Sequence, residues 1–547
     1  MKKSRITGLL MAGIVATSIG FTACGGGKNA HYDADGNKVT DTSKILEIAL
    51  WNSGLGRQWL DDLTEAFKEK NKGIAVSIIA SGSQDTFYNT ITSGAKANSF
   101  DLYFTYGPAY RKYFEGQYKN GNYLESLDDV YGATPIGEDK TIAEKFPSYM
   151  LEEFKVNDHY YSGIWQASAN GLLYNHTEFA AHEAWKMNTA TGLPNTTNQL
   201  KALSQTIMDT TREGSTEKYT PFLHVPGYPE YMWGAWWAQY EGVEKYGKFW
   251  DEEYYSYFAD MYENGWDTSE SVIYVQKGVN KALEAFYDII APEGRTMPGS
   301  NDTSTGAFSI LQTNFLQGEA MMMVNGGWLE TEMSKNQSGE QVKDRDVRFM
   351  KMPVLSSIVE TLEDNYMTDT QLSQVIDYID GGETGECPIT ISDNDLARIR
   401  EARQVTYTSG LEITTQIPSY AEGKGLAKEF LKFLYSNEGA EIYIKSTKQV
   451  PPWYTGDVDK IDTSNWSTFS KSHLELQKNA TYIYKSFEHP ISYQAGRINP
   501  FDASNDPAVK FTSEGASRQT VSQFIVNNIN ILKGHWVQMR TSMGIKD

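Results

Sequence analysis

Hydrophobic and polar positions in the first part of the chain alternate between two patterns. Short apolar runs predict three strands, at residues 45–51, 74–80 and 100–104. Between the first two runs, large apolar side chains recur at spacings of three and four, at Trp59, Leu60, Leu63 and Phe67. This spacing predicts an amphipathic helix that ends near residue 72, and residues 87–97 predict a second helix. Because strands and helices alternate, the sheet should be mostly parallel, with every strand-to-helix loop at one edge.

The segment that ends at Trp328 predicts a helix end, a buried strand and a turn in succession. Gly318 should end the helix, and residues 320–324 form an apolar run without alternation, which is typical of a strand covered on both faces. Two glycines, Gly326 and Gly327, should end the strand and let backbone approach a ligand. Ligands of open α/β sheets bind beyond the carboxyl ends of strands, so Trp328 is a candidate stacking platform. The alternative is a core residue at a sharp turn.

Residues 228–240 form the richest aromatic cluster of the chain. In a helix, one face would carry Trp236 and Tyr240, and another would carry Trp233 and Trp237. Both faces cannot be solvated, so we expect one to join the core and the other to be available to a cleft. For any single tryptophan here, the core is the favoured position.

Two segments in the second half of the chain predict further helices. Residues 355–407 predict two helices, 368–378 and 393–402, separated by an acidic turn. We interpret this segment as a surface appendage at the rim of a cleft, with a solvated helix face made by Asp395, Arg398 and Glu401. Calcium binding by the acidic turn is a less favoured alternative. A closing amphipathic helix should begin near residue 521, with Gly534 as its C-cap.

Residues 1–23 have the three parts of a secretory signal: basic residues, an apolar stretch and small residues before a cleavage point. The following Cys24 fits a bacterial lipobox, although Phe21 stands where leucine is usual. Lipid on Cys24 would tether the protein to a membrane without a spanning segment. Residues 25–43 are polar and glycine-rich, which predicts a flexible tether.

Composition narrows the classes of partner. The net charge of −21 would repel nucleic acid and anionic membranes. Of the two cysteines, lipidation of Cys24 would leave Cys387 without a partner, so neither a disulfide framework nor a cysteine-based zinc site is expected. The 13 Trp and 34 Tyr residues suit carbohydrate binding, because aromatic faces stack on sugar rings while their polar edges donate hydrogen bonds. Aromatic cores would account for the same excess.

The segment at residues 315–328 resembles a signature of the family 1 extracellular solute-binding proteins, the maltose-binding-like receptors of ABC importers. That signature has a phenylalanine, then Gly-Lys/Glu-Ala-Ala-Met, apolar residues and Gly/Asn-Gly-x-Trp. Residues 160–175 are similar to a family passage that leaves the first lobe, with Trp165 replacing the usual proline. Further similar segments follow in family order up to the end of the chain, at residues 193–200, 347–353, 426–443, 450–453 and 515–521.

This resemblance implies a two-lobed periplasmic-binding-protein type II fold of the α/β class. We expect lobe 1 at residues 44–168 plus 412–458, and lobe 2 at 172–408 plus 462–547. The lobes should close like a hinged trap, with the chain crossing near residues 169–171, Gly410 and 455–461.

The predicted function is capture of a carbohydrate, an oligosaccharide in the first instance, and its delivery to the permease subunits of an ABC importer. Tryptophans should supply stacking faces, and polar side chains of the first-lobe loops should bind sugar hydroxyls. The candidate ligand-binding residues are Trp51, Asn52, Arg57, Gln84, Asp85, Tyr106, Trp165, Trp233, Trp236, Trp328 and Trp453. We expect no catalytic residue, cofactor or metal, a monomer, no nucleic-acid partner, and membrane contact through the lipid anchor only, on the extracytoplasmic face.

Two alternatives remain open from the sequence. A glycosidase or lyase needs only two carboxylates that meet in a cleft, and the chain has 70 acidic residues from which to draw. A ferric-ion receptor would use adjacent tyrosines such as Tyr160–Tyr161 and Tyr254–Tyr255. No local catalytic motif favours an enzyme, since His182-Glu183 lacks the second histidine of a zinc-protease motif.

Overall fold

The computed structural model describes most of the chain. The described residues are 30–52, 54–81, 87, 90–91, 100–106, 123–152, 154–156, 158–188, 190–249, 276–304, 306–334, 345–408, 413–484 and 505–542. The predicted lipidation site at Cys24, the candidate residues Gln84 and Asp85, and most of the predicted helix at 87–97 lie outside them.

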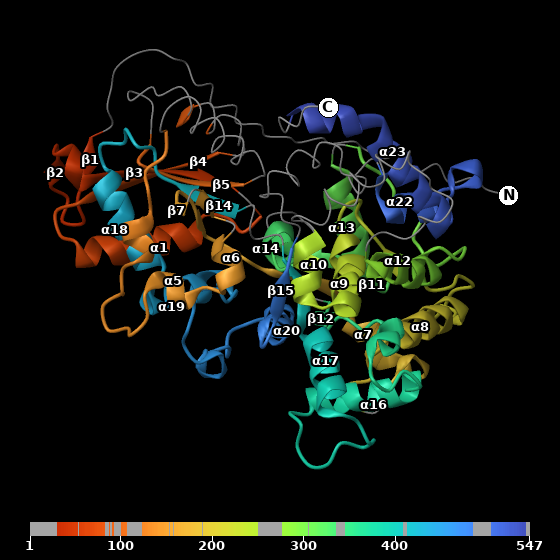
Figure 1. Cartoon of the computed structure of the whole chain (residues 1–547). Coiled ribbons are helices and arrows are strands. Elements are labelled where there is room, and N and C mark those ends of the chain that lie inside the picture. Colours follow the sequence, from red (N-terminus) through yellow and green to blue (C-terminus); the bar gives the residue numbers. More distant parts are fainter. Residues whose placement is uncertain are drawn as a thin grey trace.

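Two sheets organise the fold (Figure 1). The five-stranded sheet of lobe 1 has the order β4-β3-β5-β14-β8, and β10-β11-β9-β13-β15 with β12 on β9 form the six-stranded sheet of lobe 2. The strands of lobe 1 are β3 (Ile45–Trp51), β4 (Ala75–Ser81), β5 (Leu102–Tyr106), β8 (Gly163–Ile164) and β14 (Ile413–Gln416). Those of lobe 2 are β9 (Ala169–Asn175), β10 (Phe222–Leu223), β11 (Met322–Gly326), β12 (Val347–Met350), β13 (Val405–Thr408) and β15 (Thr481–Ile483).

All strands but one share a direction in each sheet. The exception in lobe 1 is β14, which is antiparallel to β5 and β8, and the exception in lobe 2 is β9, which is antiparallel to β11, β12 and β13. Each exceptional strand is the one by which the chain enters that lobe from the other. It therefore starts at the edge where the parallel strands end, so the carboxyl ends of both parallel sets lie at the junction of the lobes.

Helices cover both sheets. In lobe 1, α1 (Gln58–Lys70) buries Trp59, Leu60, Leu63 and Phe67 against the sheet, as the spacing of these residues predicts. It packs beside α18 (Lys424–Leu434) and α19 (Asn437–Thr447). Lobe 2 carries α8 (Thr197–Asp209), α9 (Glu230–Glu241), α12 (Lys277–Ile290), α13 (Ala307–Gln317), α14 (Leu329–Ser334) and α20 (Thr468–Gln477). Shorter helices are α4 (Asp128–Tyr131), α5 (Ile142–Lys145), α6 (Ser148–Glu152), α7 (His176–Ala181), α10 (Val243–Lys248) and α22 (Pro507–Thr512).

Helix α9 contains the aromatic cluster and lies inside lobe 2. Every residue from Met232 to Tyr240 is buried, so both faces of the helix belong to the core rather than one face lining a cleft. Gly234 allows the ring of Tyr407 to approach, because an added Cβ would lie 3.1 Å from it. In this orientation the helix packs against β13 and α12.

The inserted segment after β12 forms α16 (Asp369–Asp380) and α17 (Asp393–Gln404), which confirms its two predicted helices. It has a small core of its own and lies beside α8 and α9, at the bottom of Figure 1 and away from the lobe junction. The predicted position at the rim of the cleft is therefore wrong. The prediction of a solvated helix face is also wrong at Asp395. This residue is buried, and its carboxylate accepts hydrogen bonds from the backbone N–H groups of Glu363 and Asp364.

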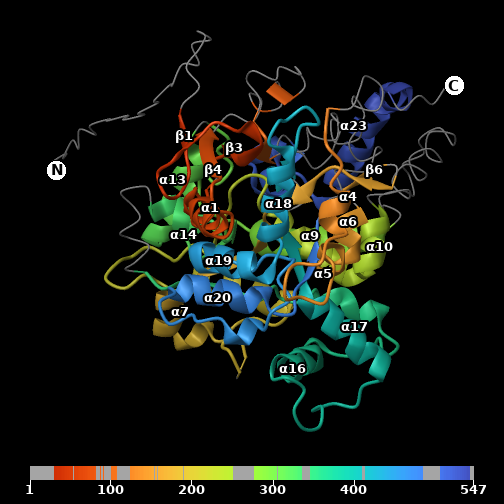
Figure 2. The same cartoon turned by 90° about the vertical axis from the view of Figure 1, so that its left-hand side faces the viewer.

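Two terminal predictions need correction. Within the predicted tether, β1 (His31–Tyr32) and β2 (Lys38–Val39) form a hairpin whose turn is held by Asp33, and Val39 packs against Ile45. Gly534 does not end the last helix, because α23 (Val521–Ser542) continues past it to bury Trp536. Tertiary packing here outweighs the weak helix propensity of glycine. Figure 2 shows α23 from the side, beyond α4 and α6.

Candidate functional site

The lobe junction brings two tryptophans together from opposite lobes. Trp51 is the last residue of β3, and Trp328 follows β11 and immediately precedes α14. Their ring centroids are 6.0 Å apart, with the ring planes tilted by 47°. Both rings are only partly buried. Two aromatic surfaces from different lobes therefore meet at the edge where the parallel strands of both sheets end.

Two glycines bring the segment before Trp328 close to the hinge. A Cβ on Gly326 would lie 2.4 Å from the Oδ1 of Asn170, and one on Gly327 would lie 2.5 Å from the ring of His473. Close packing rather than unusual backbone torsion thus requires glycine at both positions. The predicted strand end is shifted, since β11 includes Gly326 and pairs it with Asn170. Gly318 does end α13, as predicted, with a φ of 82°.

The chain crosses between the lobes within residues 165–168, since Ala169 is already paired with Thr408 in the sheet of lobe 2. This crossing lies just before the predicted 169–171. A second crossing joins β13 to β14 through residues outside the described ranges, Gly410 among them, and a third joins α19 to α20. The third crossing contains the predicted 455–461 segment.

Two glutamines link these crossings to the loop before Trp328. Gln166 donates through Nε2 to Oε1 of Gln449 over 3.0 Å, and Gln449 donates through Nε2 to the carbonyl oxygen of Gly327 over 3.3 Å. Gln166 and Gln449 are both buried. The first crossing, the third crossing and the end of β11 are thus joined by one short chain of hydrogen bonds.

Several buried polar atoms at this edge have no hydrogen-bond partner among the described residues. They include Nε1 of Trp328, Oε1 of Gln166, Nδ2 of Asn325, Oε1 of Gln312 and Nδ1 of His224. Each such atom costs roughly 1–3 kcal/mol when it stays unpaired, so groups of them mark places where a ligand or water completes the structure. Asn325 is near the carboxyl end of β11 and Trp328 follows that strand, while His224 follows its parallel neighbour β10.

Two histidines at this edge are buried and neutral. His473 lies beneath Gly327, with Nε2 2.9 Å from the carbonyl oxygen of Ala169 and 3.2 Å from Oγ of Ser168. Desolvation lowers the pKa of His473 to about 4. Desolvation likewise lowers the pKa of His224 to about 4, although its Nε2 lies 2.8 Å from Oδ1 of Asn301. Neither imidazole carries a charge near neutral pH.

Lobe 2 also reaches lobe 1 through Glu332 of α14. The carboxylate of Glu332 accepts a hydrogen bond from Nε2 of Gln312 over 2.8 Å. It packs so closely on the loop after Trp51 that a Cβ added to Gly54 would lie 2.4 Å from Oε1 of Glu332. The hydrogen bond between Gln312 and Glu332 also holds α13 beside α14.

Four of the candidate tryptophans do not supply a stacking face. Trp165, Trp233, Trp236 and Trp453 are each at most 1 % exposed. Trp165 stacks on Trp59 at 5.1 Å, and Trp236 donates its N–H to the carbonyl oxygen of Pro353 over 2.9 Å. Trp453 donates to the carbonyl oxygen of Leu434. These rings form the cores of the two lobes, which corrects the prediction that they line the cleft.

The remaining candidates differ in what surrounds them. Asn52 is exposed, and its backbone N–H donates to Ser81. Arg57 is exposed at the start of α1, and its guanidinium is bound by the carboxylate of Asp61. Tyr106 ends β5, where it is paired with Ile413, so its backbone reaches the lobe junction.

A row of aromatic rings follows the edge of lobe 2, and two of its members, Tyr228 and Tyr231, come from the aromatic cluster at residues 228–240. Phe308, Tyr228, Tyr231 and Tyr407 are successive neighbours, with centroid separations of 5.5, 5.3 and 5.0 Å. The row begins at α13 and ends on β13, whose next residues cross to lobe 1. Tyr228 and Tyr231 are partly buried. In the sequence, Tyr228 and Tyr231 are three residues apart around the start of α9, and this spacing indicates that their rings lie next to each other.

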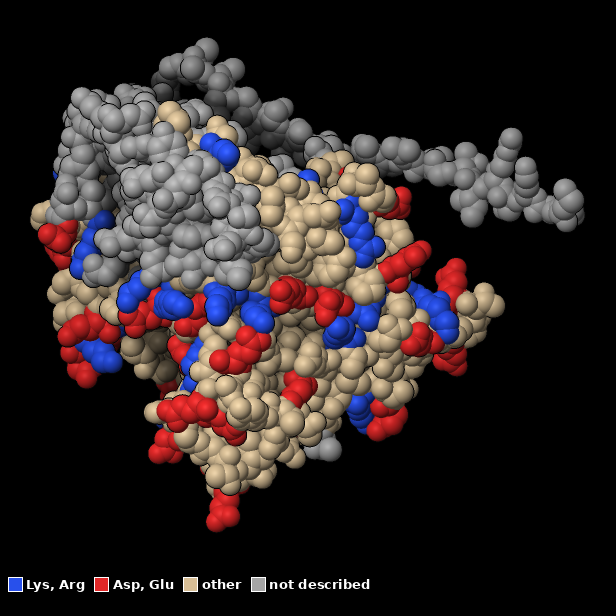
Figure 3. Space-filling model, turned by 45° about the vertical axis from the view of Figure 1, so that its right-hand side comes forward, with Lys and Arg blue, Asp and Glu red and all other residues tan. Residues whose placement is uncertain are grey.

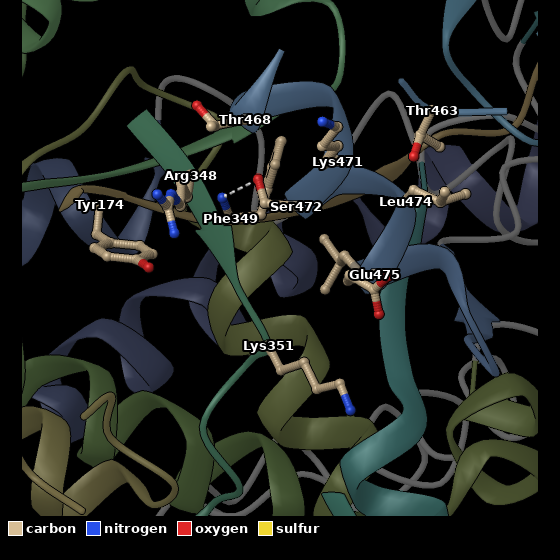
Figure 4. Close-up of a pocket in the computed structure, with 11 residues that line it drawn as sticks. Tyr174, Arg348, Phe349, Lys351, Thr463, Thr468, Lys471, Ser472, Leu474 and Glu475 are labelled. Atoms are coloured by element: carbon tan, nitrogen blue, oxygen red, sulfur yellow. Dashed lines mark hydrogen bonds between the residues drawn. The ribbon is translucent and has the colours of Figure 1, made fainter. Parts of the chain in front are cut away.

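A separate pocket of about 470 Å³ lies at the other end of β9, between β12 and α20 (Figure 4). Ser472 lines it and accepts the backbone N–H of Phe349. Two of its basic side chains, Arg348 and Lys351, are already paired with Asp346 and Asp380. On the surface, acidic and basic side chains are interspersed, without a large basic patch on the described part of the face in Figure 3.

No helix within the described ranges is both long and apolar enough to span a bilayer. Within the same ranges, no group of three or more histidine, cysteine, aspartate or glutamate side chains is arranged to hold a metal ion.

Two α/β lobes, three segments that cross between them, and aromatic rings at their junction define a hinged two-lobed binding protein. The chain belongs to the bacterial extracellular solute-binding proteins, because the model of that family matches residues 52–441. Proteins of this family are binding proteins, and the membership places this chain outside the cytoplasm. No curated protein sequence matches the chain.

Solved structures share the fold at low sequence identity. The raffinose complex of the solute-binding protein RafE aligns with 91 % of this chain and 99 % of its own, with a TM-score of 0.53 and 13 % identity. The GacH receptor of Streptomyces glaucescens, described with and without acarbose, aligns over 90 % and 97 %, with a TM-score of 0.53 and 11 % identity. MalE of Bdellovibrio bacteriovorus with maltotriose aligns over 90 % and 100 %, with a TM-score of 0.51 and 12 % identity.

Proposed function

We propose that this protein captures a carbohydrate between its lobes and delivers it to an ABC importer. The observation that carries the proposal is the meeting of Trp51 and Trp328 across the lobe junction at 6.0 Å. Aromatic faces that are partly exposed stack on the apolar faces of sugar rings, and unpaired polar atoms nearby suit hydroxyl groups. The structurally similar receptors named above bind raffinose, acarbose and maltotriose.

Sugar entry requires the two lobes to separate. A sugar ring held between two aromatic faces needs roughly 7–8 Å between them, because non-bonded carbon atoms approach to about 3.5–4.0 Å. The separation of 6.0 Å between Trp51 and Trp328 is smaller than this. Ligand that bridges both lobes then shifts the population towards a liganded closed state by as much as its differential affinity for that state.

A thermal-shift screen tests the proposal directly. The panel contains galactose, maltose, maltotriose, raffinose and N,N′-diacetylchitobiose, and ligand at about 100 times its dissociation constant should add about 2.7 kcal/mol of stability. Stoichiometric binding with the sugar recovered intact supports a receptor. Turnover of the sugar would instead support the glycosidase or lyase alternative, and a visible tyrosinate-iron absorption band would support a ferric-ion receptor.

Attachment to the membrane is a separate part of the proposal. The sequence before Cys24 has the form of a lipoprotein signal, and two or more acyl chains hold a protein stably on a bilayer. Labelled palmitate should enter the full-length protein and should not enter Cys24→Ala. Incorporation into both proteins, or into neither, would contradict the anchor. The mature protein should be a monomer, which light scattering of the Cys24→Ala protein measures.

A further inference from the structure

The two glutamines beneath the lobe junction have a fixed orientation. A carbonyl oxygen only accepts hydrogen bonds, so the group of Gln449 that faces Gly327 is its amide N–H. The oxygen of Gln449 must then face Gln166, which places the amide nitrogen of Gln166 towards it. The backbone carbonyl of Gly327 thereby decides which end of each side chain faces which way, through two successive hydrogen bonds.

The consequence is that Gln166 has an unused acceptor. Its Oε1 is buried and has no partner among the described residues. The two hydrogen bonds lead from Gln166 through Gln449 to Gly327, and the next residue, Trp328, has an indole N–H that is also buried without a partner among the described residues. An indole N–H only donates and an amide oxygen only accepts. A hydroxyl group does both, so one hydroxyl can complete the two groups at once.

We infer that Trp328 Nε1 and Gln166 Oε1 together recognise one hydroxyl group of the bound carbohydrate, with Gln449 as a positioning residue. This inference rests on the proposed sugar-binding function and adds the residues that select among sugars. Trp328 contributes its ring to stacking and its N–H to the hydroxyl oxygen, whereas Gln166 accepts the hydroxyl hydrogen. Gln449 holds Gln166 in the accepting orientation and does not touch the ligand.

The arrangement explains why the site lies at the hinge. Gln166 belongs to the first crossing segment, Gln449 to the third, and Trp328 to lobe 2. A change in the angle between the lobes alters the relation of these three segments. Recognition of the hydroxyl therefore depends on the angle between the lobes, because that angle sets the relation of the three segments.

The test compares sugars that differ at one hydroxyl. The probe is the tightest binder among galactose, maltose, maltotriose, raffinose and N,N′-diacetylchitobiose, together with its monodeoxy and mono-O-methyl derivatives. At one position, the deoxy derivative should bind the wild-type protein at least about tenfold more weakly, because both groups lose their partner. The O-methyl derivative at that position can accept from Trp328 but cannot donate to Gln166.

Substitution of Gln166 should remove this discrimination. Gln166→Met should bind the parent sugar about tenfold more weakly and should bind the parent and the deoxy derivative with similar affinity. Gln449→Leu frees the amide of Gln166 to turn over and donate, so the ratio between parent and O-methyl affinities should fall. Gln477→Met is the matched control, because Gln477 is a neighbouring glutamine whose amide is already paired with Val450. It should leave both ratios unchanged.

The outcomes separate the inference from the function on which it rests. If the wild-type protein binds none of the panel, both the proposed sugar-binding function and this inference are contradicted. If it binds a sugar but no deoxy position costs more than about twofold, the inference alone is overturned, whether or not any variant folds. An unchanged discrimination ratio in folded Gln166→Met would overturn it as well.

Discussion

The tryptophans of α9 and the tryptophans of the lobe junction differ in burial and in the pairing of their N–H groups. Trp236 and Trp237 are fully buried, and their N–H groups are paired with Pro353 and with Oε1 of Gln276. Trp328 is partly exposed at its ring, while its buried N–H lacks a partner among the described residues. The difference teaches that aromatic content alone does not locate a binding site. We propose that an exposed face together with an unsatisfied polar edge does.

Substitution of Trp236, a core tryptophan of α9, should have the largest effect on stability. Trp236→Ala should lower the free energy of unfolding by about 3–5 kcal/mol, because it leaves a large cavity and an unpaired carbonyl at Pro353. The molecules that remain folded should bind sugar with unchanged affinity. Urea denaturation monitored by circular dichroism measures the first quantity, and titration of the folded fraction measures the second. A stability loss below about 1 kcal/mol would mean that α9 is not a core helix.

Acid should lower the free energy of unfolding, because two buried histidines lie at the lobe junction. Burial lowers the pKa of His224 and of His473 to about 4, from the ordinary value of 6.5. Between these pH values the unfolded chain binds a proton at each histidine and the folded chain does not. Stability is therefore complete above pH 6.5 and falls as the pH drops towards 4, by up to roughly 3 kcal/mol for each histidine.

Substitution assigns this acid sensitivity to the buried imidazoles. His473→Gln removes one titrating group and retains a side-chain donor for the carbonyl of Ala169, so the fall in stability between pH 6.5 and 4 should become shallower. His159→Gln, at an exposed position, is the control. Parallel pH profiles for wild type and His473→Gln would show that other groups cause the acid sensitivity.

Substitution of Trp328, the junction tryptophan, should affect sugar binding more than stability. Trp328→Ala should weaken sugar binding by about 2 kcal/mol, or about 30-fold, as expected for a central aromatic contact. The loss in unfolding free energy should be smaller than that of Trp236→Ala, since the ring is only partly buried. Isothermal titration with the tightest sugar of the panel measures the affinity. Unchanged affinity with a lowered melting temperature would assign Trp328 to the core.

Patterns in the sequence predicted the framework because each depends on neighbouring residues. The apolar spacing of α1, the glycine that ends α13 and the two helices of the insertion are local features, and all three predictions were confirmed. The mostly parallel direction of the lobe 1 sheet follows from the alternation of strands and helices at the start of the chain. Motifs in family order supplied the two-lobed arrangement, which the family match and the similar folds confirm.

The site was less predictable because it depends on burial and on contacts between distant residues. No local pattern distinguishes Trp165, which stacks inside the core, from Trp328, which reaches the junction. The pairing of Gln166 with Gln449 joins residues 283 positions apart, and nothing near either glutamine indicates it. The helical face around Asp395 was misjudged for the same reason, since its partners lie more than thirty residues earlier.

The smallest effect should come from Arg57, at the edge of lobe 1. Its guanidinium is paired with Asp61 one turn later in α1, and both side chains are exposed, so Arg57→Ala should change the unfolding free energy by less than about 0.5 kcal/mol. Because Asp61 already occupies the guanidinium, sugar affinity should change by less than about twofold. Titration at low and high salt checks this result, with Asp61→Ala as the control that releases the arginine. A loss of more than about tenfold on Arg57→Ala would extend the site from the aromatic faces to a charged first-lobe edge, and the contrast between core and junction tryptophans would then describe only half of the site.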